Sequence, residues 1–504
     1  MAGGVTATKL RAIIPQSTVV RLLSDLILLR FRPLMDTYSA SNGLAQRVLG
    51  GGKGGQTLDI ASCAQFALEM GRDAEDMAAV GQMDVKNYHD SFDRVHLYRS
   101  MRRRGISREW AIAAIRIHRC ARVRLQVRGS LTDVITRSKG ALTGNCLSPA
   151  FGRMTMEDVF TMCDHLTEQS IFKLGGIELK PMAWSDNIVV FANSTRKAGR
   201  IMGFIEEHLY LNGGLLVKEG SAEIIPACSR ILTWASVRVN GRDCPVIDSF
   251  KCLGFQITCN GNTAGQKSRT LGALRGLLAS AAKRIARPGI SQYCRARWWR
   301  AQINGFVGYN AAFIGPSKTM YRELEVIGNK GARMVASLPP RYLVGSVLDQ
   351  VQKDHKICVA YLFCETIVRR IGHCFRHPEL PVVQFLSFPL QERLASIRMV
   401  GRRSEVSEAS LRSWNFLSFF GIAGDPPVGG HLDIRGHSGC VMRWGAGWFE
   451  ELRDSLGWDF ERNDRAASAL RSDMLVQLFC SSRASNAVQA ISDALPVALA
   501  IDNV

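Results

Sequence analysis

Hydrophobic positions along the 504-residue chain change their spacing several times, and each change predicts a different element. From Ser17 to Met35 apolar residues recur at helical intervals among arginines, which predicts an amphipathic helix with a basic edge. Ala79 to Val85 is a short apolar run that predicts a strand, and Trp110 to Ile117 predicts a helix. Met182 to Ala192 predicts a strand, a tight turn and a second strand. The first half of the chain should therefore mix helices and strands.

Two helix ends can be predicted from capping chemistry. Ser148 followed by Pro149 favours a helix start, because serine accepts a hydrogen bond from an orphan amide and proline has no amide to satisfy there. This helix is expected to run to about Ser170. A second helix, from about Arg196 to Leu211, should stop at Asn212-Gly213-Gly214, where glycine can adopt the left-handed cap.

Beyond Phe250 the spacing of apolar residues becomes that of long helices, and arginines are frequent among them. These helical patterns begin near Thr263, break at Pro288-Gly289 and end at Pro339-Pro340. Alternating strands and helices followed by a helical block favour an α+β class. The domain boundaries predicted from these changes are 1–78, 79–257, 258–340 and 341–504, and the last region has no readable role.

The composition indicates an anionic partner. Lysine and arginine total 64 against 44 acidic residues, which gives a formal net charge of +20, and arginine outnumbers lysine. Arginine presents a planar fork that matches a phosphate, so nucleic acid fits this excess better than a small acidic substrate does. The plainer alternative is that the positive charge only keeps the protein soluble.

Several classes of protein are not supported by the sequence. The 14 cysteines form neither a CxxC pair nor a cluster with histidine at zinc spacing, so reduced thiols in an intracellular protein are expected. No apolar run reaches the roughly 20 residues that span a bilayer, so no membrane partner is expected. Gly50, Gly52 and Gly55 formally satisfy GxGxxG, but no strand precedes them and the phosphate-loop pattern fails, so a nucleotide-binding loop is not predicted.

The chemistry-bearing candidates are two separated aspartates. Asp84 is expected at the end of the predicted strand and Asp186 in the predicted turn. Nucleotide transfer uses two Mg²⁺ ions about 3.5 to 4 Å apart, which need at least two converging carboxylates. Each residue taken alone has an ordinary structural explanation, because a Ser-Asp-Asn turn is common hairpin chemistry and strand ends often carry aspartate.

The order of the motifs adds a family resemblance. The chain resembles reverse transcriptases of non-LTR retrotransposons and group II introns in four successive segments, Asp84–Asp90, Gly140–Pro149, Trp184–Phe191 and Phe250–Gly254. Weaker similarities to the fingers of the same enzymes are found upstream at Arg11–Ile13, Gln46, Thr57 and Asp59. Arg369–Pro378 is similar to a basic Gly-His segment that follows the polymerase in many non-LTR elements. The resemblance covers roughly residues 10 to 380.

This resemblance implies a right-hand polymerase. Residues 1–78 would be partial fingers, 79–257 an antiparallel-sheet palm with the remaining fingers, 258–340 a helical thumb and 341–504 a mainly helical C-terminal extension. The implied activity is RNA-directed DNA polymerisation, with an RNA template, a DNA primer and dNTPs as partners and two Mg²⁺, or Mn²⁺, as cofactors. Asp84 and Asp186 would hold the metals, with the Val85 carbonyl and Asn187 as auxiliary ligands.

The resemblance also implies roles for other residues. His89 stands where the family has an aromatic residue that screens the sugar 2′-hydroxyl. Template and nucleotide contacts would come from His89, Thr143, Gly144, Ser148 and Lys218, and the primer grip from Phe250, Leu253 and Gly254. Phosphate contacts are expected from Arg102, Arg103, Arg104, Arg295, Arg297 and Arg300. Around Trp298 and Trp299, the alternative is a solvated helix face with the tryptophans packed inward.

Departures from the family pattern leave the activity open. Asn187 replaces the second aspartate of its motif, Thr143 replaces a glutamine, and Ser221 falls where a proton-donating lysine is expected, with Lys218 as a substitute. A catalytically inactive nucleic-acid-binding protein is therefore the main alternative to a working enzyme. A maturase-like splicing cofactor is a second alternative that nothing in the sequence favours. Nuclear localisation follows only from the resemblance, and the oligomeric state is not encoded in these patterns.

Overall fold

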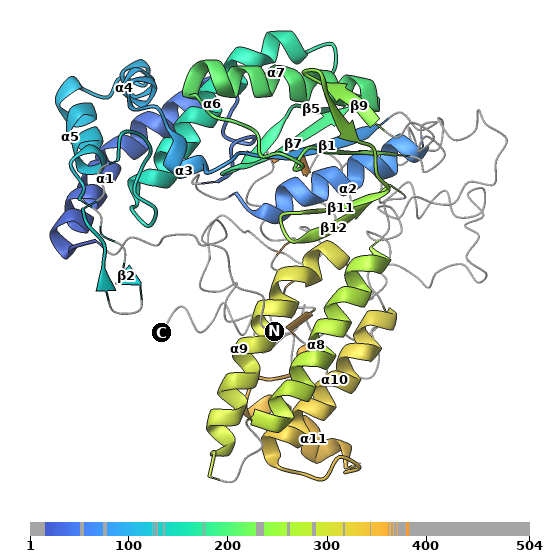
Figure 1. Cartoon of the computed structure of the whole chain (residues 1–504). Helices are drawn as coiled ribbons and strands as arrows, with labels where there is room; N and C mark the ends of the chain where they lie inside the picture. Colours follow the sequence, from blue (N-terminus) through green and yellow to red (C-terminus); the bar gives the residue numbers. More distant parts are fainter. Residues whose placement is uncertain are drawn as a thin grey trace, which may run out of the picture. The chain divides into compact units, whose positions relative to one another are not determined.

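The computed structural model describes residues 16–382 with gaps (Figure 1). The gaps are 51–54, 74–77, 123, 125, 128–129, 135–136, 175–176, 228–235, 260–262, 285–288, 316–317, 343, 361, 364–365, 367–369 and 371–379. The predicted fingers segment Arg11–Ile13, most of Arg369–Pro378 and most of the C-terminal extension lie outside the described residues. The chain divides into two compact units: unit 1 is Met1–Ile60 with Asp76–Leu253, and unit 2 is Ala61–Glu75 with Gly254–Val504.

Unit 1 is built on an antiparallel sheet of four strands in the order β6-β7-β1-β8. The strands are β1 (Ala79–Asp84), β6 (Met182–Trp184), β7 (Asn187–Ala192) and β8 (Glu223–Pro226). After its first residue β7 is buried throughout, which explains why its sequence is a continuous apolar run rather than an alternating one. The predicted strand near Ala79 and the predicted hairpin from Met182 to Ala192 are both confirmed.

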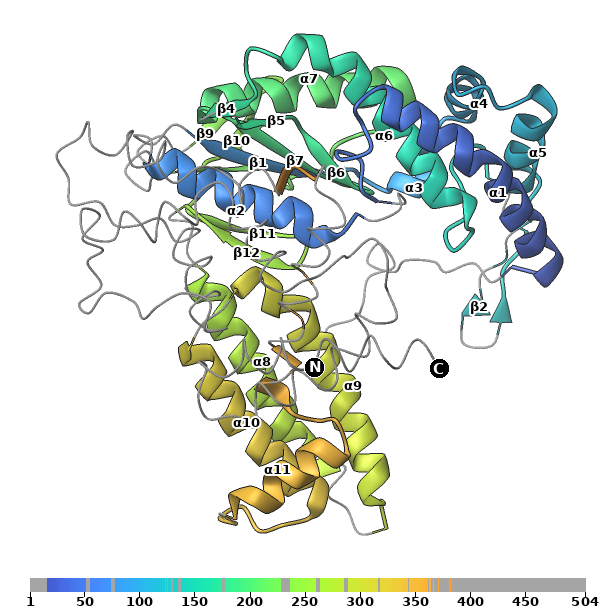
Figure 2. The same cartoon turned by 180° about the vertical axis from the view of Figure 1, so that it is seen from behind.

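Six helices belong to unit 1 among the described residues: α1 (Thr18–Ser41), α3 (Tyr88–Ser91), α4 (Arg94–Arg103), α5 (Arg108–Arg119), α6 (Leu147–Thr167) and α7 (Thr195–Gly213). Helix α7 lies along the sheet beside β1, β7 and β8, and α6 packs beside α7 (Figures 1 and 2). Gly214, at φ 61°, caps α7 where the sequence predicted its end.

One predicted helix start is wrong in detail. Helix α6 begins at Leu147 with Cys146 as its N-cap, so Ser148 already lies inside the first turn. The Ser148 hydroxyl donates to the carbonyl oxygen of Leu142 at 2.7 Å instead of accepting from an orphan amide. Pro149 keeps its predicted place in the first turn, where a missing N–H is tolerated.

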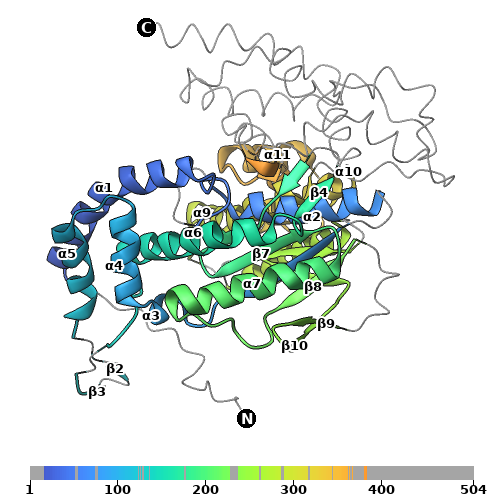
Figure 3. The same cartoon turned by 90° about the horizontal axis from the view of Figure 1, so that it is seen from above.

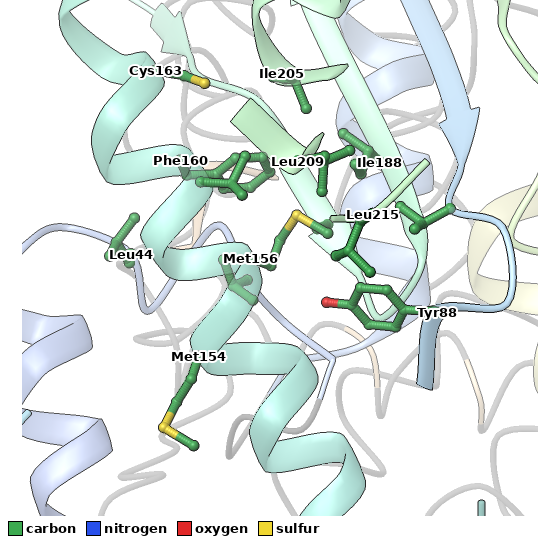
Figure 4. Packing of buried hydrophobic residues seen from close by; sticks show 14 of the residues in the cluster. Leu44, Tyr88, Met154, Met156, Phe160, Cys163, Ile188, Ile205, Leu209 and Leu215 are labelled. Carbon is green, nitrogen blue, oxygen red and sulfur yellow. The ribbon is translucent and has the colours of Figure 1, made fainter. Parts of the chain in front are cut away.

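The core of unit 1 lies between the helix pair and the sheet. Figure 4 shows Met156 and Phe160 from α6 meeting Ile205 and Leu209 from α7 over Ile188 of β7. All five side chains are fully buried. The short strands β2 (Gln126–Val127), β3 (Ser130–Leu131), β4 (Phe172–Leu174), β5 (Ile177–Leu179), β9 (Ser236–Val239), β10 (Arg242–Pro245) and β11 (Ser249–Cys252) complete the unit. The β9–β10 hairpin packs on α7. The sheet forms one layer of the unit, and α6 and α7 form the second.

Unit 2 is mainly helical in the described part. It contains β12 (Phe255–Thr258), α8 (Ala264–Arg284), α9 (Gln292–Ile314), α10 (Lys318–Ala336), α11 (Gly345–Asp354) and most of α2 (Thr57–Asp73). Helices α8, α9 and α10 pack together (Figures 1 and 2). Trp299 of α9 is fully buried and lies against Gly331 of α10. A Cβ on Gly331 would come within 2.5 Å of the indole nitrogen, so glycine permits this close approach.

The molecule mixes helices with an antiparallel sheet, in agreement with the predicted α+β class. The predicted break at Pro288-Gly289 falls between α8 and α9, and the helical block after Thr263 is confirmed. The assignment of these regions to fingers, palm and thumb stays a prediction. No helix in the described ranges is long and apolar enough to cross a bilayer.

Candidate active site

Two aspartates lie at the same end of the unit 1 sheet. Asp84 ends β1 and is paired in register with Asn187, the first residue of the adjacent strand β7. Asp186 precedes Asn187 in the two-residue turn between β6 and β7. Directly opposed residues of antiparallel strands have Cα atoms about 4.5 to 5.5 Å apart, so Asp84 and the turn are neighbours. The backbone N–H of Val85 also donates to the Asp186 carbonyl oxygen at 3.0 Å and fastens the turn to the strand end.

The turn that carries Asp186 is held in an unusual backbone conformation. Ser185 has φ 57°, a left-handed value that few residues other than glycine adopt readily. The segment 47–50 runs beside β6, where the Leu49 amide donates to the Ala183 carbonyl oxygen at 3.0 Å. A Cβ on Gly50 would lie 2.4 Å from the Ser185 amide nitrogen. Gly50 is therefore part of the site's support, and no sequence pattern signalled this contact.

Lys218 and Ser221 surround the Asp84 backbone and side chain. The Lys218 amide donates to the Asp84 carbonyl oxygen at 2.8 Å, and its ammonium nitrogen lies 3.7 Å from Asp84 Oδ2. The Ser221 hydroxyl donates to the Lys218 carbonyl oxygen at 2.7 Å and accepts from the Asp84 amide at 3.1 Å. Ser221 thus fixes the loop that brings Lys218 to Asp84, and its hydroxyl is engaged with backbone.

The donor atoms at this site suit a hard cation. They are the carboxylates of Asp84 and Asp186, the Asn187 amide and the Val85 carbonyl, all of them oxygen donors. The Asn187 amide nitrogen donates to Asp186 Oδ1 at 3.3 Å, which leaves its oxygen for another partner. No group of three or more His, Cys, Asp or Glu side chains able to hold a metal occurs in the described part of the chain. This set fits Mg²⁺, which keeps several waters and uses one or two carboxylates together with substrate phosphates.

A buried tyrosine, Tyr88, lies close enough to Asp186 to feel its charge. Burial, followed by the charges of Asp186 and Glu157, raises the pKa of Tyr88 well above its usual value, so the phenol stays protonated. Its hydroxyl donates to the Gly152 carbonyl oxygen at 2.7 Å. Tyr88 is therefore a neutral, fixed support that no sequence motif singled out.

His89 and the predicted template loop meet next to this site. The Ala141 amide donates to the His89 carbonyl oxygen at 2.6 Å, which ties the loop to α3 just after Asp84. In this loop Thr143 is half-buried and Gly144 is exposed at φ 95°. Ser148 is 2% exposed, so the expectation that it contacts a template is wrong. Its hydroxyl instead closes the loop onto α6 through Leu142.

Arg94 and His118 hold the same loop from the opposite side. The Arg94 guanidinium donates to four successive backbone carbonyls, those of Arg137, Ser138, Lys139 and Gly140. His118 Nδ1 accepts from the Leu142 amide at 2.9 Å. Burial, with the nearby charges of Arg94 and Arg137, lowers the pKa of His118 to about 4, so the ring is neutral near pH 7.

The predicted primer-grip residues lie at the division between the two units. Phe250 in β11 is 4% exposed, and Leu253, at φ 48°, is the last residue of unit 1. Gly254 opens unit 2 at φ 92°, where a Cβ would come within 3.0 Å of the Tyr309 ring. Glycine is needed at position 254 because of this positive φ and because of the close approach of the Tyr309 ring. The primer-binding role of these residues stays a prediction.

The six predicted phosphate-binding arginines have different surroundings. Arg102 and Arg103 are exposed at the end of α4, and Arg103 contacts Asp158 at 2.7 Å. Arg104 is buried, with its guanidinium 2.9 Å from both Glu157 and Asp158, so the expectation that it binds nucleic acid is wrong.

The other three arginines lie on α9 of unit 2. Arg297 and Arg300 are exposed, whereas Arg295 is half-buried and donates to the Ser337 hydroxyl. Trp299 is fully buried, as expected if this helix face is solvated and its tryptophans pack inward, whereas Trp298 is only half-buried. Two exposed cations therefore remain on α9 for a phosphate backbone.

Comparison with known proteins returned distant structural likenesses only. No protein-family model and no curated protein matches the chain. Among solved structures, apo telomerase from Candida tropicalis matches with a TM-score of 0.39 and 10% identity over 77% of this chain and 61% of that one.

Two further telomerase structures match at a similar level. A C-terminally truncated apo telomerase from Candida tropicalis has a TM-score of 0.33 and 14% identity, with 48% of this chain and 44% of that one covered. Telomerase from Candida albicans in complex with a TWJ fragment of telomeric RNA has a TM-score of 0.35 and 10% identity, with coverage of 67% and 56%. The chain thus spans about half the length of these proteins, and likenesses this weak decide neither its fold family nor its function.

Proposed function

We propose that this chain is an RNA-directed DNA polymerase of the reverse-transcriptase type, descended from a non-LTR retrotransposon. The observation that carries the proposal is the register of β1 against β7, which brings Asp84 beside the Asp186-Asn187 turn. In the sequence these residues occupy separate motifs about a hundred positions apart, in the order that the reverse-transcriptase family has. The net charge of +20 is the second support, because a polymerase must hold a polyanionic duplex.

Each residue at the site has a role in this proposal. Asp84 and Asp186 would hold two Mg²⁺ ions, with the Val85 carbonyl and Asn187 completing the protein ligands. When bound, these ions supply activation of the primer hydroxyl and neutralisation of the leaving pyrophosphate. The loop of Thr143 and Gly144 would position the template and the incoming base. Lys218 is the candidate proton donor, because the Ser221 hydroxyl is engaged with backbone.

Primer extension by the purified full chain on an RNA template, with Mg²⁺ and Mn²⁺ in parallel, tests the proposal. We expect metal-dependent extension that is lost in Asp84→Asn, because removing one carboxylate charge weakens cation binding. Asp243→Asn is the matched control, since Asp243 is an exposed aspartate of the β9–β10 hairpin in the same unit. Extension that persists unchanged in Asp84→Asn would contradict the proposed site.

A second candidate is a nucleic-acid-binding protein of the same descent without turnover. Three observations favour it. Asn187 stands where the family has a second aspartate, the Ser221 hydroxyl already donates to the Lys218 carbonyl oxygen and not to a leaving pyrophosphate, and the Lys218 ammonium pairs with Asp84. This candidate predicts no extension with either metal. It also predicts RNA binding whose affinity falls steeply with salt, because each neutralised phosphate releases counterions.

A further inference from the structure

Helix α1 has an exposed apolar stripe on the side opposite its packed face. The packed face carries Ser24, Ile27, Phe31, Met35 and Ser39, all buried in unit 1. On the other side the exposed fractions are 74% for Val19, 59% for Leu22, 45% for Leu23, 58% for Leu26 and 62% for Leu29. These five residues are called the α1 stripe below. Single exposed aliphatic residues are normal on a protein surface, but five adjoining ones indicate an interaction surface.

The spacing of the stripe is that of a paired helix. Val19, Leu22, Leu26 and Leu29 follow one another at intervals of three and four residues, which are the a and d positions of two heptads. Leu23 then takes the flanking e position. A surface helix with only one apolar face would not repeat this seam on its solvent side. Figure 3 shows α1 together with α4 and α5 at one end of unit 1.

The charges beside the stripe make it self-complementary. Asp25 flanks one edge at a g position, and Arg30 flanks the other edge at the next e position. In a parallel helix pair each g residue faces the e residue five positions further along the partner helix. Asp25 of one copy would therefore meet Arg30 of the other, twice by symmetry. An antiparallel pair would bring like edges together and lose this match.

We propose that α1 pairs in parallel with α1 of a second copy of this chain through the α1 stripe. This inference is independent of the catalytic activity proposed above. Asp25 lies close to Cys146 of the same chain. Burial, followed by a hydrogen bond and the charge of Asp25, raises the pKa of the Cys146 thiol to about 12, so the thiol stays protonated.

A second copy fits this surface better than a membrane does. A helix that lies on a bilayer keeps a polar face toward water, whereas the far side of α1 is packed into its own protein. The stripe spans only three helical turns and the chain is strongly basic, so the pair should be weak, with a Kd of about 1 to 100 μM.

Sedimentation equilibrium of the full chain over about 1 to 100 μM tests the pairing directly. We expect a concentration-dependent monomer–dimer equilibrium that Leu26→Glu shifts to monomer by at least about tenfold in Kd, because a carboxylate would enter the apolar seam. The matched control is Leu211→Glu, at a leucine that is 65% exposed on α7, and it should leave the equilibrium unchanged. A wild-type chain that stays monomeric throughout would overturn the proposal.

A charge swap tests the parallel arrangement. Asp25→Arg should weaken the dimer, because two arginines would then face each other, and Arg30→Asp in the same chain should restore it. Helical content by circular dichroism checks that each variant is folded. If the double variant stays as weak as Asp25→Arg, the parallel pairing is wrong. Dimerisation that Leu26→Glu leaves unchanged would show that another surface is used and would likewise overturn the proposal.

Discussion

Unit 1 contains two pairs of carboxylates, Glu157 with Asp158 and Asp84 with Asp186, that differ in burial and in their cationic partners. Glu157 and Asp158 on α6 are buried, and Arg104 reaches both at 2.9 Å. Glu157 also lies 2.8 Å from Arg153, and Asp158 lies 2.7 Å from Arg103. The Arg104 guanidinium lies over the Tyr38 ring at 4.1 Å. Asp84, at the sheet end, meets Lys218 at 3.7 Å, and the lysine side chain is 61% exposed.

The difference shows which carboxylates hold the fold and which remain available to a ligand. A buried carboxylate must be compensated inside the protein, because an isolated charge in the interior costs several kcal/mol. The α6 pair satisfies this requirement with guanidinium groups from α4 and from α6 itself, so it joins these helices. Asp84 and Asp186 are only partly buried, and the pairing of Asp84 with an exposed lysine can be replaced by a cation.

The largest expected effect is on stability, at the α6 pair. Arg104→Met should lower the free energy of unfolding by about 3 to 5 kcal/mol, because Glu157 and Asp158 would stay buried without their shared cation. Chemical denaturation followed by circular dichroism measures this change. Arg102→Met is the matched control, since Arg102 is exposed on the same helix and should change stability by less than about 1 kcal/mol.

Asp84→Asn is the counterpart at the other carboxylate pair. Because Asp84 is only partly buried and pairs with the largely exposed Lys218, the substitution should change stability by less than about 1 kcal/mol while abolishing extension. Equal destabilisation by Arg104→Met and Asp84→Asn would show that both pairs are structural and would remove the contrast between them.

The next effect is a loss of stability in mild acid, and it comes from His118 rather than from Asp158. The pKa of His118 is lowered to about 4 in the folded chain, so its neutral ring favours folding above the unfolded value near 6.5. This contribution, about 3 kcal/mol, is lost as the pH falls from 6.5 toward 4, where the unfolded chain binds the proton more readily. Denaturation midpoints measured across this range should fall, and His118→Gln should flatten the slope.

Asp158 of the α6 pair should respond only in stronger acid. Burial would raise the pKa of Asp158, but the hydrogen bond from His96 and the Arg104 charge outweigh it and lower this pKa to about 2. A depressed carboxyl pKa contributes stability above the unfolded value near 3.8 and loses it as the pH falls through about 2. A stability loss between pH 6.5 and 4 that His118→Gln leaves unchanged would contradict this division of roles.

A smaller effect is expected at the support of the Asp186 turn. Gly50→Ala would place a Cβ 2.4 Å from the Ser185 amide nitrogen, so the turn must shift. We expect a stability cost of about 1 to 3 kcal/mol and a marked loss of extension, since Asp186 would move relative to Asp84. Gly43→Ala is a useful comparison at φ 63°, because no atom lies within 4 Å of its Cβ and only backbone strain is added. Similar losses of extension in both variants would argue against a specific role of Gly50.

Gly50 also illustrates how far the sequence could be interpreted. The strand before Asp84 and the hairpin around Asp186 were predictable, because their apolar runs are short and bounded by turn residues. The contact between Gly50 and Ser185 was not, since it joins positions far apart in the chain through the absence of a side chain. In the sequence, Gly50 stood out only as the first glycine of a GxGxxG pattern, and that pattern did not predict a nucleotide-binding loop because no strand precedes it.

The arginines show a second limit of the same kind. Arg102, Arg103 and Arg104 are indistinguishable as a sequence of three cations, yet only Arg104, the C-cap residue of α4, is buried. Its acidic partners Glu157 and Asp158 lie on another helix, so only the tertiary packing of α4 against α6 separates a surface charge from a buried one. The same holds for Ser148, whose hydroxyl was expected to face a template and bonds to the chain instead.

The smallest effect concerns Lys218 and would sharpen the contrast between the two carboxylate pairs. Lys218→Ala should leave stability within about 1 kcal/mol of wild type, because the ion pair with Asp84 is largely exposed. It should also tighten Tb³⁺ binding by up to about fivefold, since a competing ammonium is removed from Asp84. Titration with Tb³⁺, followed by its luminescence, measures this affinity without any need for turnover, and Lys218→Arg keeps the charge as the matched control. Weaker Tb³⁺ binding in Lys218→Ala would mean that the lysine organises the site rather than competing for it, and Asp84 would then resemble the α6 pair in depending on a permanent cation.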